Sequence, residues 1–394
     1  MANLKLLHID IVKEFSLIRP AERIIFGKEF LKLGTETIFL LINKHNHLKG
    51  NIYYRRVISF KRIRFEYELF FILLKIIRKE HIEIIQVRND FTAGFIGLLV
   101  SFIYKKKFIF LRSFPSEDHA LEFAKLGKMK FSWVRVPYYK LKKRCYKYLL
   151  NHAHLVITKS KSFTDQLIAD GINKTKIISI PMGFDNHLLD EDQYGNHKWN
   201  KMWVGKTTLL YFGAMDTPRR LSFLFRVFKM ILMKEPNVIL VMAGGTGSDI
   251  DDLKNYAKKL NIDRYVMFTG SLGQVDLSYL IKSIDLTLSP IPPSKNYMVS
   301  SPTKVVESLG LGTPVVANRE IPDQAEVLNE SQGGFLTNYD EENFAQTILQ
   351  AFSLKGRLRE IGKIGQKYIL KYRTYSYLAK IVMTEYLTLL KDEC

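Results

Sequence analysis

The chain has 394 residues, enough for two or three domains with sizeable hydrophobic cores. A hydrophobic content of 47% and a charged content of 25% are typical of a soluble globular protein rather than a disordered one. The two cysteines, Cys145 and Cys394, lie far apart and exclude a disulfide framework, so we expect a reducing compartment. Met1–Asp10 shows no signal-peptide pattern. The most apolar run, Ala93–Tyr104, is shorter than the roughly 20 residues that span a bilayer.

The net charge of +20 is unevenly distributed along the chain. Residues 1–185 hold 34 Lys and Arg against 16 Asp and Glu, a net charge of +18, and the rest of the chain carries +2. A basic half joined to a nearly neutral half indicates that the first half meets a polyanion, which can be anionic membrane lipid, nucleic acid or an acidic polymer. A generally basic proteome is the plainer explanation.

Strand-like and helical segments alternate through the first 185 residues. Helical periodicity is clearest in Ala21–Leu33 and Phe65–Lys79. The expected strands are Leu4–Ile9, Glu36–Ile42, Ile82–Val87, Phe108–Leu111, Leu155–Thr158 and Lys176–Pro181. Alternation of this kind predicts an α/β domain with a parallel sheet covered on both faces.

A polar, turn-rich segment at 186–204 predicts a linker between a first domain, 1–185, and a second, 205–370. The second domain repeats the alternation, with strands expected at Thr208–Phe212, Val238–Ala243, Val266–Phe268, Leu286–Leu288 and Val315–Ala317. Its expected helices are Leu221–Met233, Leu253–Leu260, Glu342–Phe352 and Arg357–Tyr386. Two tandem α/β domains predict a ligand cleft at their carboxyl edges. Residues 371–394 are expected to pack back toward the first domain as a C-terminal helix.

One stretch, Ser300–Asn318, combines the features of a phosphate site. A loop with Pro302 leads into a short helix that ends at a pair of glycines, and a buried strand follows. The unpaired N–H groups at the helix start favour an anion, and Lys304 adds a full charge there. Glu307 lies one turn further along, where a carboxylate can accept hydrogen bonds from ribose hydroxyls. The plainer alternative is a loop-helix-strand unit of any α/β domain, with both side chains merely solvated.

Two glycine-containing turns follow expected strands in the second half. Arg219 and Arg220 come shortly after Gly213, and two arginines there can hold a diphosphate bidentately. Gly244-Gly245 suits close backbone approach by a ligand. An exposed helix start and a tight strand-to-helix turn explain these features equally well. The nine histidines show no metal-ligand spacing, and no Walker A, G-x-G-x-x-G or G-x-S-x-G motif occurs.

The second half also carries an ordered set of short motifs, each weak alone. They are Ile178–Asp185, Tyr211–Gly213, Val241–Gly245, Phe268–Gly270 and Ser301–Ala317. In this order and spacing they resemble the retaining, nucleotide-sugar-dependent glycosyltransferases of the GT-B fold. The resemblance is to the family 4-like, group 1 class, which includes many bacterial lipopolysaccharide and capsule enzymes. It implies two Rossmann-like domains with parallel sheets facing across a cleft, and it covers the first half less well.

The resemblance implies roles for the matching positions. Glu307 would grip the donor ribose, Arg219 and Arg220 would contact the donor diphosphate, and Lys304 would support it together with the amides after Ser301. Gly270 would begin the loop near the base. The full set of implied donor-binding residues is Gly213, Arg220, Gly244, Gly270, Ser301, Thr303 and Glu307, and the implied catalytic residues are Arg219, Lys304 and Arg112. No protein nucleophile would be needed, because the leaving phosphate helps to deprotonate the acceptor hydroxyl. Arg219, Lys304 and the helix start would neutralise the leaving diphosphate, so no metal or other cofactor is expected.

Five residues at four sites depart from the family. Val299 stands where a second glutamate often contacts the transferred sugar, and Ala214 stands where an arginine is common. Arg19-Pro20 replaces a Gly-Gly pair that comes just before Ala21–Arg23, the end of a loop facing the donor. Arg112 replaces a first-domain histidine, as it does in a subset of these enzymes. His119 and Arg88-Asn89-Asp90 are other candidates at strand ends, where a structural role is the plainer explanation.

The densest basic stretch of the first half lies between Phe123 and Ser160. Tyr138, Leu141, Cys145 and Leu149 form an apolar stripe at helical spacing, with Lys140, Lys143, Arg144 and Lys147 at its side. Such a helix can lie on an anionic membrane, and in the family this region often faces a lipid-linked acceptor. A core-packed helix with a solvated basic face is the alternative.

These observations predict a cytoplasmic glycosyltransferase, peripheral at the inner membrane face. It would use a UDP- or GDP-linked sugar to extend a lipid-linked or cell-envelope glycan, and no nucleic acid partner is expected. A nucleotide-sugar epimerase of the same fold is a second hypothesis, and the +18 half argues against it because an epimerase needs no acceptor surface. A degenerate, non-catalytic glycan-binding subunit is a third, motivated by Val299 and Ala214.

Overall fold

The computed structural model divides the chain into two compact units. Unit 1 is Met1–Pro181 with Tyr375–Cys394, and unit 2 is Met182–Thr374. The residues that the structure describes are 4–12, 18–43, 47–49, 52–56, 62–125, 131–189, 199–245 and 247–391.

Unit 1 is built on an eight-stranded sheet with the order β3-β4-β2-β1-β5-β6-β7-β8. The strands are β1 (Leu4–Ile9), β2 (Thr35–Asn43), β3 (His47–Lys49), β4 (Ile52–Arg56), β5 (Ile84–Arg88), β6 (Lys107–Arg112), β7 (Leu155–Thr158) and β8 (Ile177–Ser179). Neighbouring strands are parallel except for β3, which pairs with β4 in antiparallel fashion. The sequence analysis did not predict β3 or β4. The central strands β5, β6 and β7 are buried throughout, as the continuous apolar runs predicted.

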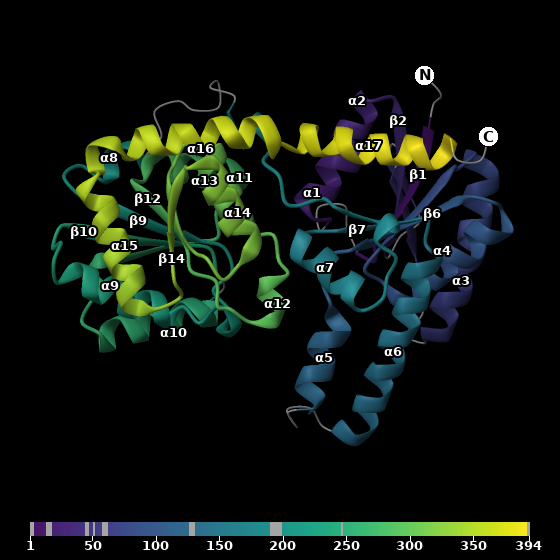
Figure 1. The fold of residues 1–394 in the computed structure, drawn as a ribbon, viewed down its shortest axis with the longest axis horizontal. Helices are drawn as coiled ribbons and strands as arrows, with labels where there is room; N and C mark the ends of the chain where they lie inside the picture. The colour runs from purple at the N-terminus through teal and green to yellow at the C-terminus, as the bar shows by residue number, and fades with distance from the viewer. Residues whose placement is uncertain are drawn as a thin grey trace. The chain divides into compact units, whose positions relative to one another are not determined.

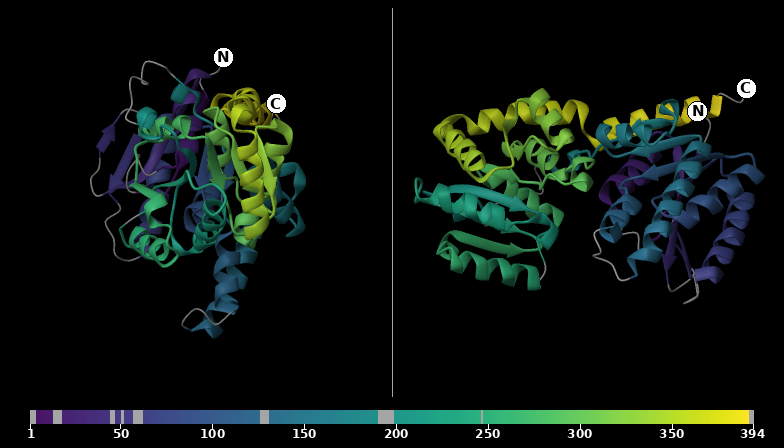
Figure 2. Two further views of the ribbon diagram at one scale, coloured as in Figure 1. Left: turned by 90° about the vertical axis from the view of Figure 1, so that its left-hand side faces the viewer. Right: turned by 60° about the horizontal axis from the view of Figure 1, so that its bottom comes forward.

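The helices of unit 1 follow the strands in the expected alternation. They are α1 (Pro20–Glu22), η2 (Arg23–Glu29), α2 (Phe30–Lys32), α3 (Arg62–Glu80), α4 (Phe91–Ile103), α5 (Ser116–Lys125), α6 (Ser132–His152), α7 (Lys161–Ala169), η3 (Lys174–Lys176) and α17 (Tyr375–Lys391). The C-terminal helix α17 belongs to unit 1, where the Tyr386 hydroxyl donates to Gln86 Oε1 and the Tyr386 ring meets Phe30 edge-on. Helices α5 and α6 pack together and extend away from the sheet of unit 1 as a pair (Figures 1 and 2).

Unit 2 has a six-stranded, fully parallel sheet with the order β11-β10-β9-β12-β13-β14. The strands are β9 (Thr207–Phe212), β10 (Val238–Ala243), β11 (Val266–Gly270), β12 (Leu286–Ser289), β13 (Val315–Asn318) and β14 (Gly334–Thr337). The helical segments are η4 (Asn186–Leu189), α8 (Trp199–Met202), η6 (Thr217–Arg219), α9 (Ser222–Leu232), α10 (Gly247–Lys259), η7 (Asp263–Tyr265), α11 (Gln274–Ser283), α12 (Lys295–Met298), α13 (Thr303–Gly310), α14 (Pro322–Ser331), α15 (Glu341–Ser353), η8 (Lys355–Arg357) and α16 (Leu358–Tyr372). Strand β14 and helix α14 were not predicted.

Two buried clusters hold the layers of unit 2 together. One includes Leu209, Phe225 and Phe228, and the other includes Phe184, Trp199 and Leu309. Trp199 is 3% exposed although it lies in the segment predicted as a linker, 186–204. The chain therefore changes unit earlier than predicted, between Pro181 and Met182, and its described linker residues pack in unit 2.

Candidate functional site

Three glycines line the carboxyl ends of neighbouring strands in unit 2. Gly213 follows β9, Gly244 follows β10 and Gly270 ends β11, and all three have positive φ angles, of 119°, 117° and 69°. The Gly213 N–H donates to Ala243 O at 2.9 Å, and the Gly244 N–H donates to Gly270 O at 2.8 Å. A Cβ on Gly244 would lie 2.2 Å from Gly213 O, so only glycine fits there. The three predicted glycines thus form one side-chain-free edge that a ligand can approach.

Helix α13 begins beside this edge, one strand further along the sheet. Pro302 is its N-cap, one position earlier than predicted, and no side chain caps its first turn. The first amides of a helix lack backbone partners, and Thr303 and Lys304 supply two of them here. Asn318 holds the preceding loop in place, because its Oδ1 accepts from the Ile291 N–H at 2.8 Å and its Nδ2 donates to Ile291 O at 3.0 Å. The loop and helix start are therefore fixed to the sheet.

Two cations converge on this helix start, and each lies over a tyrosine ring. Lys304 Nζ is 4.9 Å from the centre of the Tyr211 ring and 3.2 Å from the point where a Gly213 Cβ would lie. The Arg219 guanidinium carbon is 4.9 Å from the centre of the Tyr297 ring. Burial and the nearby Arg219 charge lower the pKa of Lys304 to about 8. Burial disfavours the charged form of Lys304, so an anion placed beside its ammonium group stabilises that form.

Glu307 lies one helical turn beyond Lys304, as the spacing predicted. Burial raises the pKa of Glu307 to about 7, although the Lys304 charge opposes this shift. Lys304 itself is 8% exposed. Glu307 is half-buried, so its carboxylate can still accept hydrogen bonds from the hydroxyls of a ligand.

Ser301 has a structural role that its predicted donor-binding role did not include. Its hydroxyl donates to Asp323 Oδ2 at 2.7 Å and accepts from the Met182 N–H at 2.8 Å. The other Asp323 oxygen accepts from Arg373 Nη2 at 2.8 Å. The Ser301 hydroxyl therefore ties the first and last segments of unit 2 to the loop before α13, and its proton is already engaged.

The structure separates Arg219 from Arg220, which the sequence analysis grouped together. Arg220 has a left-handed backbone, with φ of 50°, at the end of η6. Its side chain lines a different pocket of about 560 Å³, shared with Arg226, Phe223 and Tyr339. Neither Lys304 nor Glu307 lines that pocket, so the structure places Arg220 apart from them, and its predicted contact with the donor stays a prediction.

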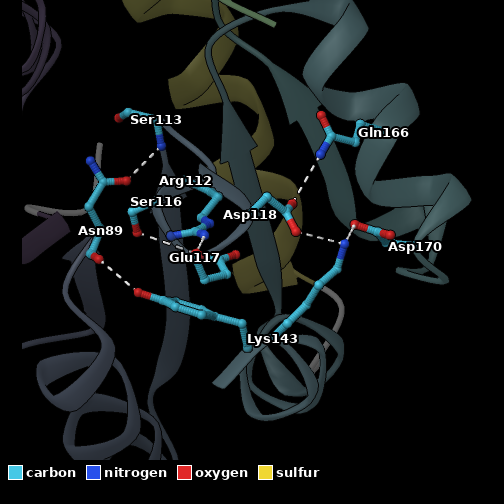
Figure 3. A network of polar contacts seen from close by, with 10 residues as sticks. Asn89, Arg112, Ser113, Ser116, Glu117, Asp118, Lys143, Gln166 and Asp170 are labelled. Atoms are coloured by element: carbon cyan, nitrogen blue, oxygen red, sulfur yellow. Dashed lines mark hydrogen bonds and ion pairs between the residues drawn. The ribbon is translucent and has the colours of Figure 1, made fainter. Parts of the chain in front are cut away.

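Arg112, predicted as catalytic, lies in a buried ion pair instead. It is 1% exposed, its Nη2 bonds Glu117 Oε2, and its guanidinium carbon is 4.0 Å from the centre of the Tyr146 ring (Figure 3). The ion pair and the aromatic ring engage one edge of the guanidinium, whereas its buried Nε and Nη1 atoms have no hydrogen-bond partner among the described residues. The strand-end pattern did not reveal Glu117, which folds back from α5 onto β6, and the catalytic role of Arg112 stays a prediction.

The other strand-end candidates of unit 1 also have structural partners. Arg88 bonds Asp10 at 2.9 Å and lies 3.4 Å from Glu22, which is fully buried in α1. Asn89 Oδ1 accepts from the Ser113 N–H at 2.7 Å, as Figure 3 shows, and Asp90 caps α4. The side chain of His119 lies outside the described residues.

The four basic residues predicted to face the acceptor or a membrane lie on α6, but they are not equivalent. Lys143 Nζ lies 2.9 Å from both Asp118 Oδ1 and Asp170 Oδ2 (Figure 3). Lys140, Arg144 and Lys147 are exposed and, within the described residues, form no ion pair or hydrogen bond. The predicted apolar stripe also divides, because Tyr138 and Leu141 are 48% and 60% exposed whereas Leu149 is buried.

Tyr211 and Tyr297 are the site residues that the sequence analysis missed as functional groups. Tyr211 lay inside a quoted motif, and its hydroxyl donates to Ala214 O at 2.8 Å. Tyr297 lies in α12, two residues before Val299, and no local signal pointed to it. Val299, which stands in place of a family glutamate, is only 8% exposed.

Two features are absent from the part of the chain that the structure describes. No helix there is long and apolar enough to cross a bilayer. No group of three or more His, Cys, Asp and Glu side chains there is arranged to hold a metal ion.

Two family models match the chain, one in each half. The model for group 1 glycosyl transferases matches residues 196–368, and the model for glycosyltransferase family 4 matches residues 28–188. Among curated relatives, the alpha-monoglucosyldiacylglycerol synthase of Streptococcus pneumoniae is 26% identical over 299 residues, which cover 74% of this chain and 64% of the relative. The chain thus spans less than two thirds of that relative's length.

Solved structures match over almost the whole chain. Sucrose-phosphate synthase from Thermosynechococcus elongatus has a TM-score of 0.74 at 16% identity, and covers 99% of this chain and 100% of its own. Anabaena HepE in complex with UDP has a TM-score of 0.73 at 16% identity, with coverage of 98% and 100%. At this identity the likeness shows the fold, which is the GT-B fold expected from the sequence.

Proposed function

Because the chain belongs to the group 1 and family 4 glycosyltransferases and has the GT-B fold, we propose that it transfers a sugar from a nucleoside diphosphate to a lipid-linked or cell-envelope glycan. The donor would be UDP- or GDP-linked, and the new linkage would retain the anomeric configuration. The enzyme would work at the inner face of the cytoplasmic membrane. The observation that carries the proposal is the convergence of Arg219 and Lys304 at the uncapped start of α13, beside Gly213.

The chemistry of the leaving group explains why these residues are placed together. When the glycosidic bond breaks, negative charge grows on the diphosphate, and fixed cations and helix amides stabilise it without reorganising. Lys304 lies within one turn of the α13 start, and Arg219 is held over Tyr297. Glu307, one turn along, is placed to accept hydrogen bonds from the donor ribose. These groups neutralise the leaving diphosphate in our proposal, so we expect turnover to persist with EDTA.

The relatives support the donor class and the acceptor class as proposals. HepE has been solved with UDP and with UDP-glucose, and the pneumococcal relative is named alpha-monoglucosyldiacylglycerol synthase. A donor with a nucleoside diphosphate fits the two cations, and a lipid-linked acceptor fits the +18 charge of residues 1–185.

The experiment is a donor panel followed by product analysis. The purified chain is first screened by thermal shift against nucleotides and nucleotide sugars, because a specific ligand raises the melting temperature by mass action. The best donor is then incubated with membrane lipid extract in EDTA, and the anomeric configuration of the product is read by NMR. Sugar transfer with retention supports the proposal. Conversion of the donor alone to an epimer, or binding with neither transfer nor hydrolysis, would contradict it.

A further inference from the structure

The exposed basic residues of α6 border a pocket in unit 1, between α5, α6 and α7. Its volume is about 380 Å³. All four predicted residues, Lys140, Lys143, Arg144 and Lys147, line it, and its apolar lining comes from Leu121, Leu150, Phe163, Leu167 and Ile172. A volume at the lower end of ligand pockets accommodates one compact group rather than a stretch of polymer.

Lys143 is the crosslink that keeps the three helices in place around this pocket. Its ammonium lies 2.9 Å from Asp118 of α5 and 2.9 Å from Asp170 at the end of α7 (Figure 3). Although burial lowers the pKa of Lys143, the hydrogen bonds to Asp170 and Asp118 raise it overall. Gln166 of α7 also donates to Asp118 at 3.2 Å. The carboxylates of Asp118 and Asp170 are thus used for architecture and leave the remaining cations uncompensated.

Lys140, Arg144 and Lys147 are spaced four and three residues apart, so they lie on one face of α6. All three are exposed, and none pairs with a carboxylate in the part of the chain that the structure describes. Three uncompensated cations at the rim of an apolar pocket match a ligand with an anionic head and a hydrocarbon continuation. A free nucleotide or a nucleic acid strand would leave the apolar lining unused.

The start of α6 also offers exposed apolar side chains that the hydrocarbon part of such a ligand can contact. The first turns of α6 present Trp133, Val134 and Tyr138 to solvent, with exposed fractions of 79%, 46% and 48%. These turns lie on the α5–α6 pair, which extends away from the sheet (Figures 1 and 2). Aromatic side chains with an apolar body and a polar edge are favoured at the boundary between headgroups and acyl chains.

We propose that this pocket binds the phosphate-bearing headgroup of one membrane lipid, with Lys140, Arg144 and Lys147 on the phosphate and the apolar lining against the first carbons of the chain. The inference deepens the proposed function, on which it rests, by naming the lipid side of the acceptor. It places the contact in a pocket rather than on a flat basic face, and it excludes Lys143 from direct lipid binding.

The test is calorimetric titration of the full chain with dihexanoylphosphatidic acid below its micelle concentration. Inorganic phosphate, dihexanoylphosphatidylcholine and duplex DNA are the comparison probes. The wild type should bind phosphatidic acid more tightly than the other three. The variant K140Q/R144Q/K147Q should bind it at least about tenfold more weakly, because each basic residue near an anionic lipid surface contributes measurably.

Two further variants keep the result interpretable. K229Q/K258Q/K259Q removes the same charge from exposed positions of unit 2 and should keep wild-type affinity for phosphatidic acid. Leu121→Asn should weaken phosphatidic acid without changing the affinity for inorganic phosphate. Equal binding of phosphate and phosphatidic acid would mean a free-anion site and overturn the proposal, as would equally tight binding of DNA or equal losses in the two triple variants. No nucleotide sugar is present, so failure here leaves the donor reaction of the proposed function standing.

Discussion

Lys304 lies over the Tyr211 ring at 4.9 Å, and no carboxylate among the described residues forms an ion pair with it. The aromatic face attracts the ammonium without cancelling its charge, unlike a carboxylate partner. Arg219 is held in the same manner over Tyr297, with Asp216 Oδ1 3.5 Å from its Nε. The tyrosine rings therefore position both cations, but only Lys304 keeps a charge that no described carboxylate offsets, because Arg219 also forms an ion pair with the exposed Asp216.

Arg219→Ala should lower kcat by about 10²–10³ while changing the melting temperature little, because the guanidinium meets charge that grows in the transition state. Arg220→Ala is the matched control. Its side chain lines the separate pocket with Tyr339, so its effect on kcat should be much smaller. Steady-state kinetics on both variants provide the measurement. A larger loss for Arg220→Ala would move the diphosphate site to the other arginine.

Glu307→Ala should weaken donor binding by about ten- to a hundredfold with the fold retained, because charge-assisted hydrogen bonds to the ribose are lost. Calorimetry with the intact donor and with its 2′-deoxy and 3′-deoxy ribose analogues checks this. The variant should not distinguish the three ligands, whereas the wild type should. Unchanged affinity in the variant would remove Glu307 from the site.

Donor affinity should be highest between about pH 7 and 8. Lys304 has a pKa of about 8 in the free protein, so above that pH it must take up a proton to meet the diphosphate, and affinity falls. Glu307 has a pKa of about 7, so below that pH it must lose a proton to accept from the ribose, and affinity falls again. Titrations of a nucleotide sugar across pH give the profile. In Glu307→Gln the decrease in affinity below pH 7 should disappear, and the decrease above pH 8 should remain. A decrease below pH 7 that persists in this variant would belong to another group.

Ser301→Ala should reduce the free energy of unfolding by about 1–3 kcal/mol, because the Met182 N–H and Asp323 each lose a hydrogen-bond partner. Ser301→Thr keeps the hydroxyl and is the control. Chemical denaturation measures both. If Ser301→Ala instead weakens donor binding with stability unchanged, the hydroxyl serves the ligand as originally predicted.

Because of His8, we expect the free energy of unfolding to decrease already at a pH above the range in which carboxylates titrate. Burial lowers the pKa of His8 to about 3 from 6.5, so its stabilising contribution is complete above pH 6.5 and is lost as pH falls toward 3. The loss is at most about 1.4 kcal/mol per pH unit.

The window between pH 6.5 and 4.5 isolates this effect from Glu22. Burial raises the pKa of Glu22, but the charges of Lys159 and Arg88, which also face His8, lower it overall to about 2. The contribution of Glu22 to the free energy of unfolding therefore changes only below pH 4.5. Burial raises the pKa of Asp10, which acts in the opposite sense. His8→Phe should flatten the slope, since the ring would keep its contacts with Phe26 and Phe39. Chemical denaturation at pH 6.5 and 4.5 measures the change in the free energy of unfolding between these pH values. If this change is the same in His8→Phe as in the wild type, another group causes it.

Local sequence signals predicted the strands of both sheets except β3, β4 and β14, the glycines at the strand ends and the family, and these predictions are confirmed. Such features are readable because a buried parallel strand is a short apolar run, and a tight turn after it needs glycine wherever φ is positive. The short strands β3 and β4 escaped because they lie at the edge of the sheet, outside the strongest apolar runs.

The availability of each charged side chain could not be read locally, because it depends on partners that are distant in sequence or on one backbone angle. Arg219 and Arg220 are adjacent and chemically identical, yet Arg219 lies over the Tyr297 ring, whereas Arg220, with its left-handed backbone, lines a pocket with Tyr339. Lys143 differs from its basic neighbours on α6 only because Asp118 and Asp170 meet it when three helices pack together. Sequence spacing identifies which charges are present, and packing determines which of them remain free for a ligand.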